Sequence, residues 1–357
     1  MTDSATTIKH HLLLITLRSD LGGGPRHVSD LTGFLKKQKK FQTYIASPLE
    51  SPYGGQFQAE GYAHFELPHR RFSLFKLLQL LVFCHKHQIK TVHSHGRGAG
   101  AYSRFLTLFN IKVIHTFHGV HAPKNFADQV KLYLDKILNV FTHKNIFVST
   151  SEFKQAQNLG LTMNQNFQII SNGLNLSNDD THLEDQWDQY RTHQNSILVG
   201  CLTRLDEHKG NKYLIGYFRK LPEHFILLIA GDGPEKDELK KMIDDYGLSH
   251  RIHLLGNVSE PDHFLRSIDI LTSASKSEGL PYAMLEAMAL KVPILASKVS
   301  GHVDLLLREN LFERDNTSEY CRKIQSSFLT KNIEMNHRRI LDDFDLEKNF
   351  SELIKNY

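Results

Sequence analysis

Short apolar runs alternate with amphipathic stretches over almost the whole of the 357-residue chain. His10–Leu17 (HHLLLITL) is the first such run, and Phe225–Ala230 (FILLIA) is a later one. Continuous apolar strands separated by amphipathic helices are typical of βαβ units, in which helices cover both faces of a parallel sheet. The pattern therefore predicts a doubly wound α/β fold.

The same pattern predicts the elements of the first half. Its strands are expected at His10–Leu17, Thr43–Ser47, Ala63–Leu67, Thr91–Ser94, Lys112–Phe117, Lys144–Ser149 and Phe167–Ser171. Its helices are expected at Arg26–Lys37, Phe72–His87, Ala99–Phe109, Lys124–Val140 and Glu152–Leu159.

The second half repeats the alternation. Its strands are expected at Ser196–Cys201, Phe225–Ala230, Arg251–Leu255, Ile268–Ser273 and Pro293–Ala296. Its helices are expected at Lys212–Lys220, Glu235–Tyr246, Pro281–Ala289 and His302–Leu307.

The alternation breaks at Asn172–Asn195, which is polar and acidic. Since the chain is also longer than one common domain, we expect two domains. An N-terminal domain would span 1–176, a linker 177–195 and a C-terminal domain 196–340. A helical tail would follow at 341–357, and a return of this tail to the N-terminal domain is one option.

Charge divides unevenly between the halves. Residues 1–176 carry 20 Lys and Arg against 9 Asp and Glu, a net charge of +11, whereas residues 177–357 carry 23 against 30, a net charge of −7. A basic half favours an anionic partner such as nucleic acid, anionic lipid or a phosphorylated substrate. The simpler alternative is that solvent-exposed lysines are distributed unevenly between the halves without a functional reason.

The spacing of the cysteines and the length of the apolar segments indicate the cellular compartment of the protein. The three cysteines, Cys84, Cys201 and Cys321, are widely spaced and form no CxxC motif, which disfavours a disulfide scaffold or a zinc finger. No segment reaches the roughly eighteen apolar residues of a membrane span, and the first residues are too short for a signal peptide's apolar core. We expect a cytoplasmic protein.

Two glutamates separated by seven residues stand in Ser277–Glu286 (SEGLPYAMLE). Gly279 and Pro281 allow a tight turn with exposed backbone N–H groups, and Pro281 suits the first position of a helix. Such N–H groups and the helix dipole attract an anion such as a diphosphate. Glu278 is then expected in the loop, and Glu286 on the helix, where it can accept hydrogen bonds from a ribose diol.

Two cations follow the strand expected at Ser196–Cys201. Arg204 and Lys209 stand in the loop after this strand. Paired cations at the carboxyl end of a strand can neutralise a leaving diphosphate as negative charge develops on it. The glycine turn Ile229–Glu235 (IAGDGPE) and the segment Leu255–Val258 (LGNV) come next along the chain.

In this order and spacing, these segments resemble the family-4 retaining glycosyltransferases, which use nucleotide sugars and have GT-B architecture. The resemblance covers nearly the whole chain and is most specific over Ser196–Asp304. The N-terminal half adds Gly22–Val28 (GGGPRHV), Val92–Gly96 (VHSHG), Val113–Gly119 (VIHTFHG) and Ser171–Gly173 (SNG). The resemblance implies two doubly wound Rossmann-like domains that face a cleft.

The resemblance also implies roles for single residues. The catalytic group would be His118, Glu278, Arg204 and Lys209, with His118 and Glu278 at the transferred sugar and the two cations at the diphosphate. The donor site would consist of Gly23, Gly24, Arg204, Lys209, Val258, Glu278, Gly279, Leu280, Pro281 and Glu286. On the acceptor side, His95 and Arg97 are the candidates.

The activity implied is retaining transfer of a hexosyl unit from a nucleoside diphosphate sugar, with UDP favoured over GDP. The acceptor would be a hydroxyl of a glycan or a lipid-linked glycan in bacterial capsule, exopolysaccharide or O-antigen synthesis. Members of the family usually work without a bound metal, because Arg and Lys neutralise the diphosphate. The resemblance thus implies no cofactor, no metal and no nucleic-acid partner.

Twenty-two histidines raise the question of a metal site, and His93, His95, His115 and His118 have suggestive spacings. We expect His93 and His95 to point to opposite faces of their strand, and His115 and His118 to diverge as well. The spacing then predicts no metal site.

A basic surface offers a second partner. Lys36–Lys40 ends the first expected helix, and His69–Arg71 precedes the amphipathic helix that begins at Phe72. Together these segments could contact anionic lipid headgroups at the inner face of the cytoplasmic membrane. Ordinary capping and solubility explain the same charges locally.

Other functions stay open at this point. A GT-B epimerase or phosphorylase would share the fold, although no phosphate-binding lysine motif of a phosphorylase is found. A basic nucleic-acid-binding or lipid-binding protein without transferase activity would use only the N-terminal half. It would bind more weakly as salt rises and would be indifferent to loss of Glu278.

Overall fold

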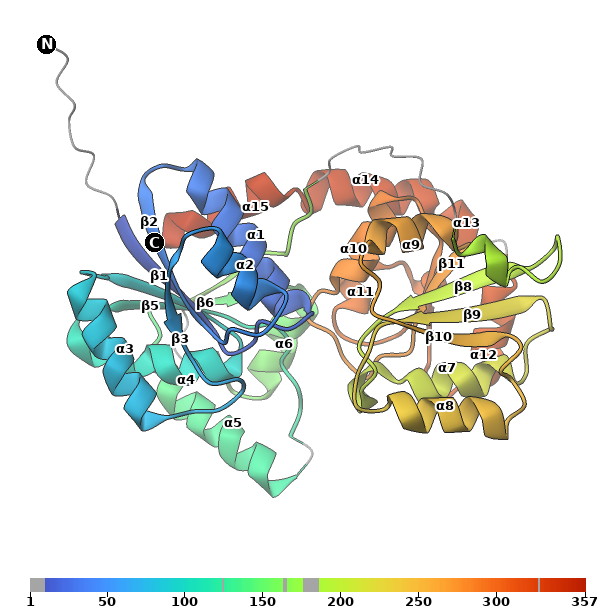
Figure 1. The fold of residues 1–357 in the computed structure, drawn as a ribbon, viewed down its shortest axis with the longest axis horizontal. Helices are drawn as coiled ribbons and strands as arrows, with labels where there is room; N and C mark the ends of the chain where they lie inside the picture. Colours follow the sequence, from blue (N-terminus) through green and yellow to red (C-terminus); the bar gives the residue numbers. More distant parts are fainter. Residues whose placement is uncertain (1–9, 124, 163–165, 176–185, 327) are drawn as a thin grey trace, which may run out of the picture. The chain divides into compact units, whose positions relative to one another are not determined.

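The computed structural model describes residues 10–123, 125–162, 166–175, 186–326 and 328–357, which divide into two compact units (Figure 1). Unit 1 contains Met1–Asn172 and Glu347–Tyr357, and unit 2 contains Gly173–Leu346. Each unit has its own parallel sheet. Residues 177–185 of the expected linker lie outside the described residues.

The sheet of unit 1 has seven strands in the order β3-β2-β1-β4-β5-β6-β7, all parallel. The strands are β1 (His10–Thr16), β2 (Phe41–Ser47), β3 (Ala63–Glu66), β4 (Thr91–His95), β5 (Lys112–Thr116), β6 (Lys144–Phe147) and β7 (Phe167–Ile169). Each lies where the apolar pattern predicted a strand. The strand order reverses between β1 and β4, and such switch points are where ligands bind in open α/β sheets.

All but the last of the helices of unit 1 connect these strands, and the last follows unit 2 in the chain. They are α1 (Gly23–Lys37), α2 (Tyr53–Ala59), α3 (Leu74–Lys86), α4 (Arg97–Leu106), α5 (Phe126–Asn139), α6 (Thr150–Asn158), and α15 (Leu346–Leu353), with 3₁₀ turns η1 (Thr107–Phe109) and η5 (Ile354–Asn356). Three of them begin at a side-chain cap, since Ser73, Asn125 and Ser149 each accept a hydrogen bond from a backbone N–H of the first turn.

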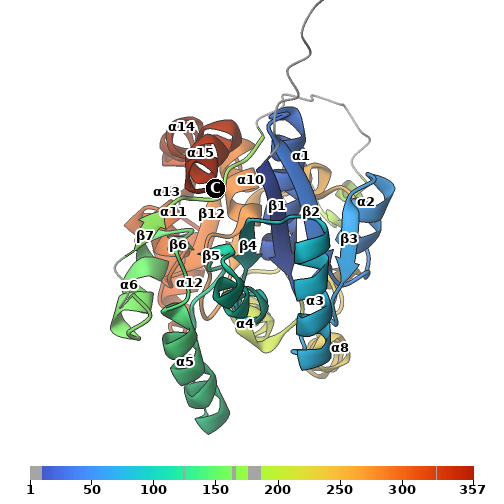
Figure 2. The same cartoon turned by 90° about the vertical axis from the view of Figure 1, so that its left-hand side faces the viewer.

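The helices of unit 1 cover both faces of its sheet (Figure 2). Val92 and His93 are consecutive on β4 and therefore point to opposite faces. Val92 is buried with side chains of α3 and α4, whereas His93 hydrogen-bonds to Tyr357, which follows α15. Phe34 of α1 packs on Phe350 of α15, with ring centroids 5.6 Å apart. Helices α1 and α15 thus lie on the face opposite α3 and α4.

This arrangement separates the two basic segments that were expected to form one surface. Lys36–Lys40 ends α1, and the Lys40 carbonyl accepts a hydrogen bond from His10 at the start of β1. Arg70 lies at the other end of β1, where its backbone N–H donates to the Leu17 carbonyl. The segments therefore lie at opposite ends of the sheet, and the expectation of one shared surface is wrong.

The sheet of unit 2 has six parallel strands in the order β10-β9-β8-β11-β12-β13, with its switch point between β8 and β11. The strands are β8 (Ile197–Leu202), β9 (Phe225–Ala230), β10 (Ile252–Gly256), β11 (Ile270–Ser273), β12 (Ile294–Ser297) and β13 (Leu311–Phe312). All but β13 lie at predicted positions. β9 (FILLIA) is completely buried, as expected for a strand covered on both faces.

The helices of unit 2 follow the same βα alternation. They are α7 (Asn211–Phe218), α8 (Lys236–Asp245), α9 (Pro261–Ser267), α10 (Tyr282–Ala289), α11 (His302–Leu305), α12 (Thr317–Ile324), α13 (Phe328–Lys331) and α14 (Ile333–Asp343), with 3₁₀ turns η2 (Asp188–Tyr190), η3 (Glu207–Lys209) and η4 (Arg308–Asn310). None of the helices in the described part of the chain is both long and apolar enough to cross a bilayer.

Candidate active site

In unit 2, a cation and a carboxylate meet beyond the carboxyl ends of β8 and β11. Lys209 ends η3, and its Nζ donates a hydrogen bond to Oε1 of Glu278 at 2.6 Å. Ser275 Oγ donates to the same oxygen at 2.7 Å. Only 13% of the Glu278 side chain is exposed. The structure thus brings together two of the predicted site residues and adds Ser275, which the sequence reading did not single out.

The surroundings of Glu278 keep its carboxylate ionised. Burial alone would raise the pKa of Glu278, but the positive charge of Lys209, the electrostatic effect of His302 and the hydrogen bonds from Lys209 and Ser275 outweigh it. The pKa of Glu278 is therefore lowered below its ordinary value. A negative charge is present here at neutral pH, beside a positive one.

Two glycines allow the loops of this site to approach so closely. Gly210 follows Lys209 with a φ of +67°, and a Cβ on it would lie 2.1 Å from the Ala274 carbonyl oxygen. Gly301 has a φ of +78°, and its Cβ would lie 2.6 Å from the Gly279 carbonyl oxygen. Only glycine adopts such conformations without cost and leaves room for the facing backbone. Gly301 was not recognised from the sequence.

Arg204 lies half-buried in the loop after β8, as predicted. Its Nε donates to Oδ2 of Asp206 at 2.7 Å, and its carbonyl accepts from Asn211 at 3.3 Å. These bonds hold the loop at the carboxyl end of β8. The hydrogen bond from its Nε therefore orients Arg204 through Asp206, two residues on.

Glu286 is the fifth residue of α10 and is 6% exposed. The helix begins at Tyr282, one residue later than expected, because Pro281 has extended backbone (φ −75°, ψ 122°) and serves as the N-cap residue. The Pro281 carbonyl accepts the first helical hydrogen bonds, from the N–H groups of Met284 and Leu285. The two predicted glutamates are thus in the loop and on the helix, as expected.

The remaining predicted donor residues of unit 2 lie on neighbouring loops. Gly279 and Leu280 connect Glu278 to the helix, with Leu280 buried. Val258 is half-buried in the loop between β10 and α9. The contact of its backbone with a base stays a prediction.

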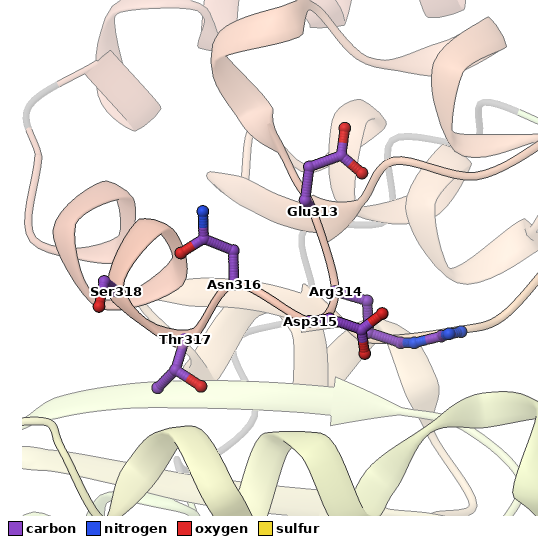
Figure 3. A pocket seen from close by; sticks show the side chains of 6 residues that line it. All are labelled: Glu313, Arg314, Asp315, Asn316, Thr317 and Ser318. Carbon is purple, nitrogen blue, oxygen red and sulfur yellow. The ribbon is translucent and has the colours of Figure 1, made fainter.

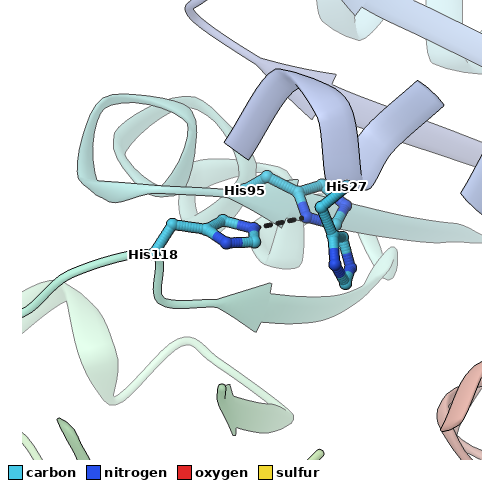
Figure 4. Close-up of side chains that lie close together, drawn as sticks. All are labelled: His27, His95 and His118. Carbon is cyan, nitrogen blue, oxygen red and sulfur yellow. Dashed lines mark hydrogen bonds between the residues drawn. The ribbon is translucent and has the colours of Figure 1, made fainter. Parts of the chain in front are cut away.

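In unit 1, three histidines from separate elements converge near the switch point of the sheet (Figure 4). His27 lies on α1, His95 ends β4, and His118 follows β5. His95 Nδ1 and His118 Nε2 form a hydrogen bond of 3.2 Å. The ring centroid of His27 is 5.3 Å from that of His95 and 5.0 Å from that of His118. His27 was not recognised from the sequence, although it stands in the quoted glycine-rich segment.

Two expectations about the histidines are settled by these contacts. His93 and His95 lie on the same face of β4, with ring centroids 4.1 Å apart, because residues two apart on a strand share a face. The expectation that they point to opposite faces is wrong. His115 and His118 do diverge: His115 bonds to Ser94 Oγ, while His118 hydrogen-bonds to His95.

The three rings are held in the neutral form. Burial lowers the pKa of His27 to about 4, against a weaker opposing effect of its hydrogen bond to Asn172. Burial and the neighbouring histidines lower the pKa values of His95 and His118 well below 6.5, and Arg18 adds to the effect on His118. Each neutral imidazole has one N–H and one acceptor lone pair, and in the bond between His95 and His118 one ring donates and the other accepts.

Gly23 and Gly24 lie at the start of α1, not in a loop before it as expected. A Cβ on Gly24 would lie 3.8 Å from the ring of His118, so this turn of the helix faces the histidine. The helix extends back to Gly23 because the Gly22 carbonyl accepts the first helical hydrogen bond, from the N–H of Arg26 at 3.1 Å.

Arg97 forms an ion pair with a carboxylate of α5. It begins α4, and its Nε lies 2.5 Å from Oδ2 of Asp135 on α5, which also pairs with the fully buried Arg104. Arg97 thus belongs to an ion-pair network between α4 and α5. Its predicted acceptor role is not supported by any contact to His95 or His118 among the described residues.

Glu152 is a buried carboxylate that the sequence reading missed. Its Oε1 accepts from the N–H of Gly119 at 2.5 Å, and its Oε2 from the N–H of Val148 at 2.9 Å. It thereby fixes the backbone directly after His118 to the end of β6. In the sequence, a glutamate three residues after the cap Ser149 resembles a capping box. This local pattern gives no sign of the long-range hydrogen bond to Gly119.

Among the described residues, one group of three side chains could hold a metal ion, and it is His27, His95 and His118. A separate hollow in unit 2 is lined by residues 313–318, at the start of α12 (Figure 3). It contains none of the predicted site residues, and Asn316 there caps the helix.

Comparison with known proteins covers both halves of the chain. Residues 184–340 match the family described as glycosyl transferases group 1, and residues 21–178 match glycosyltransferase family 4. The chain is 24% identical over 323 residues to the O-antigen biosynthesis glycosyltransferase WbnH of Escherichia coli, covering 88% of this chain and 89% of that one. It is 32% identical over 169 residues to an uncharacterized glycosyltransferase of Methanocaldococcus jannaschii, a match that spans 40% of that protein.

Solved structures share the fold. The crystal structure of Anabaena HepE in complex with UDP-glucose superposes with a TM-score of 0.84 at 17% identity, over 97% of this chain and all of that one. A sucrose-phosphate synthase from Thermosynechococcus elongatus superposes with a TM-score of 0.81, also at 17% identity. These likenesses confirm the predicted fold class, GT-B, with its two Rossmann-like sheets.

Proposed function

This chain belongs to the family-4 (group 1) glycosyltransferases, and from that premise we propose that it transfers a hexosyl unit, with retention, from a UDP-sugar to a hydroxyl of a glycan acceptor. Unit 2 would bind the donor, and unit 1 would bind the acceptor. The observation that carries the donor assignment is the half-buried Lys209–Glu278 pair beside the loop that leads into α10.

The residues of unit 2 suit a nucleoside diphosphate. Arg204 and Lys209 supply positive charge at the carboxyl end of β8, where the diphosphate would lie. Glu286 supplies a buried carboxylate, which can accept hydrogen bonds from the two ribose hydroxyls. Glu278 would accept hydrogen bonds from hydroxyls of the transferred sugar.

The reaction proposed is attack from the same face of the sugar. The acceptor oxygen forms a bond to the anomeric carbon while the bond to the diphosphate breaks. The proton of the acceptor hydroxyl passes to an oxygen of the leaving diphosphate. Arg204 and Lys209 stabilise the charge that develops there, and His118 would orient a hydroxyl of the donor sugar.

UDP is the proposed nucleotide on the basis of similar proteins. The solved structure of HepE contains UDP-glucose. We extend this donor class to the present chain because its fold is the same. The O-antigen relatives support a glycan or lipid-linked glycan as acceptor.

Donor binding is tested by thermal unfolding with UDP, GDP, ADP and their common sugar conjugates, with EDTA present. A ligand at about 100 times its dissociation constant stabilises the folded protein by about 2.7 kcal/mol, so the midpoint rises with the correct nucleotide. We expect a rise with UDP compounds that is lost in Glu286→Ala. Glu334→Ala is a matched control, since Glu334 is an exposed glutamate of α14 that pairs with Lys291.

Two results would contradict this assignment. One is a midpoint unmoved by every nucleotide. The other is a shift that persists in Glu286→Ala, which would mean that the nucleotide binds elsewhere. Affinity for DNA or RNA that falls steeply with salt would favour the basic nucleic-acid-binding alternative.

A lipid-linked acceptor implies contact with a membrane, and unit 1 has a surface suited to it. Fourteen large apolar side chains are exposed on α3, α4, η1, α5 and the segments beside them. We call this set the apolar face: Phe72, Leu74, Phe75, Leu78, Val82, Phe105, Leu108, Phe109, Phe126, Val130, Tyr133, Leu134, Ile137 and Val140.

Positive charge adjoins the apolar face at Phe72. On α5 its members recur at helical spacing, from Phe126 at 79% exposed to Val140 at 74%. Phe72 packs on Tyr102 of α4, and the exposed Arg70 and Arg71 precede it. An apolar helix face beside cations suits the interface of an anionic bilayer, and the occupant proposed is such a bilayer.

Vesicle sedimentation tests this contact. The protein should co-sediment with vesicles that contain phosphatidylglycerol, and Leu78→Glu/Val82→Glu should lower binding at least about tenfold, because each buried apolar side chain contributes about 1.5–3 kcal/mol. Leu341→Glu, on the exposed surface of α14, should bind like the wild type. If the double variant binds vesicles as well as the wild type, the apolar face is not the membrane contact. This conclusion does not depend on the donor assignment.

A further inference from the structure

We propose that His27, His95 and His118 form a binding site for a divalent transition metal ion, with Zn²⁺ as the expected ion. One ring nitrogen from each residue lies within 4.8 Å of the other two. The three rings come from α1, β4 and the loop after β5, and Figure 4 shows them turned toward one another. The proposal is independent of the proposed transfer reaction.

The spacing of the nitrogens suits one ion. Zn²⁺ binds imidazole nitrogen at about 2.0–2.1 Å, so two ligands of a tetrahedral site lie about 3.4 Å apart. His95 Nδ1 and His118 Nε2 are 3.2 Å apart. One of these two nitrogens carries the proton of their hydrogen bond, so that ring has to move the proton to its other nitrogen before both can bind one ion. Their positions then need little movement, whereas His27 has to approach by a rotation of its side chain.

His27 is oriented as metal-binding histidines usually are. Its Nδ1 lies 3.0 Å from the amide oxygen of Asn172, which can only accept, so Nδ1 carries the proton and Nε2 the lone pair. Nε2 is buried, and no hydrogen-bond partner for it exists among the described residues. A ligating histidine commonly donates its other ring N–H to a carbonyl or carboxylate, which fixes the ring and its tautomer.

The chemistry of the three ligands narrows the choice of ion. Three neutral imidazoles suit Zn²⁺, Cu²⁺, Ni²⁺ or Co²⁺, whereas Mg²⁺ and Ca²⁺ prefer oxygen ligands. The described residues add no carboxylate to the group. His118 is partly exposed, which gives an ion a route to the site, and three ligands leave a fourth position for water.

A fourth histidine nearby is excluded as a metal ligand by its hydrogen bonds. His93 lies beside His95, but its Nδ1 bonds to Tyr357 Oη at 2.8 Å and its Nε2 to Thr116 Oγ1 at 2.7 Å. Both ring nitrogens are thus engaged. The site is therefore limited to three histidines, although five lie close together.

Metal binding would compete with the role proposed for His118. A ring nitrogen that binds an ion is withdrawn from a sugar hydroxyl. If the proposed function holds, Zn²⁺ inhibits transfer, and the inhibition is relieved by a chelator. This consequence rests on the proposed function, whereas metal binding itself does not.

The experiment is titration of the metal-free protein with Co²⁺, read by visible absorption, followed by Zn²⁺ competition in a calorimeter. We expect one ion per chain and the intense visible bands of tetrahedral Co²⁺. His27→Ala and His95→Ala should each weaken binding by more than the roughly 10–100-fold that loss of an outer-shell partner costs, since each removes a ligand. His250→Ala, on an exposed histidine of unit 2, should leave binding unchanged.

Two substitutions of Asn172 are expected to change the affinity for Zn²⁺ in opposite directions. Asn172→Asp should tighten Zn²⁺ binding, because a carboxylate makes the His27 ring more basic, and Asn172→Ala should weaken it by about 10–100-fold. A merely structural defect would not produce opposite signs. Circular dichroism of each variant confirms that it is folded.

Two outcomes overturn the proposal. One is the absence of Co²⁺ bands and of Zn²⁺ heat in the wild-type protein. The other is binding that survives in both His27→Ala and His95→Ala, which would place the ion elsewhere. Neither outcome bears on nucleotide binding by unit 2, so failure here is distinguishable from failure of the proposed function.

Discussion

Replacing Lys209 with alanine is expected to lower the rate of sugar transfer by about 10²–10³-fold, the loss typical for one preorganised charge at a transition state. The ammonium of Lys209 lies 2.6 Å from Oε1 of Glu278, in the loop where the diphosphate would leave. The variant removes the positive charge and also leaves Glu278 largely buried without that partner. Steady-state kinetics with the donor identified by thermal unfolding measures the effect.

The control is Lys276→Ala. Lys276 is as exposed as Lys209, at 28% of the side chain, and pairs with Glu207 in the same part of unit 2. An exposed pair of this kind contributes little to stability, so this variant should keep wild-type kinetics. Equal rates for Lys209→Ala and the wild type would exclude Lys209 from the reaction. Equal losses in both variants would indicate a general effect of charge.

The largest effect on stability is expected for Gly231→Ala. Gly231 follows β9 with a φ of +137°, and a Cβ would lie 1.7 Å from the carbonyl oxygen of Thr203. The backbone conformation alone costs a residue with a Cβ about 1–3 kcal/mol, and the overlap with backbone adds to it. We expect the free energy of unfolding of unit 2 to fall by about 3 kcal/mol or more.

Urea unfolding followed by tryptophan fluorescence measures this change. Trp187 is the single tryptophan of the chain and packs edge-on against Phe264 in unit 2, with ring centroids 5.6 Å apart. Gly216→Ala is the matched control, because a Cβ there would meet nothing within 4 Å. In the helix α7 this substitution should be neutral or stabilise by up to about 1 kcal/mol. A Gly231→Ala protein as stable as the wild type would refute the close approach.

The elements that the sequence revealed most clearly are the buried strands. A strand such as β9 (FILLIA) is apolar throughout because helices cover both of its faces, and this pattern is hard to mistake. Two of the missed helices, α2 and α9, have seven residues each. Helix α2 (YGGQFQA) contains two glycines, which disfavour helix, and its formation depends on packing against α1. Helix α9 begins at Pro261, a start signal that was available but not used.

The site was predictable in its residue types but not in its contacts. Lys209 and Glu278 were assigned to one site by motif, yet their ion pair across 69 positions comes from the sheet order. The pairing of Arg97 with Asp135 was not predictable, because it depends on how α4 and α5 pack. The mistaken separation of His93 and His95 was an error about strand geometry rather than a limit of the sequence.

The histidine group shows a different limit. His27 is seen to belong to the site only once α1 is packed against the ends of β4 and β5. Asn172 is seen to belong to it only once the fold brings residue 172 back beside His27. Residues 145 positions apart form that hydrogen bond. No local pattern distinguishes such a histidine from one on a surface.

Helix α15 has a consequence for the order in which this protein can fold. Phe350 packs against Phe34 and His27, and Tyr357 bonds to His93, so residues 347–357 complete the interior of unit 1. A ribosome makes these residues only after it has made all of unit 2. During synthesis, part of the interior of unit 1 is therefore exposed until residues 347–357 have been made. This segment then packs onto unit 1 and completes its interior. Unit 2 can finish folding before the domain that precedes it.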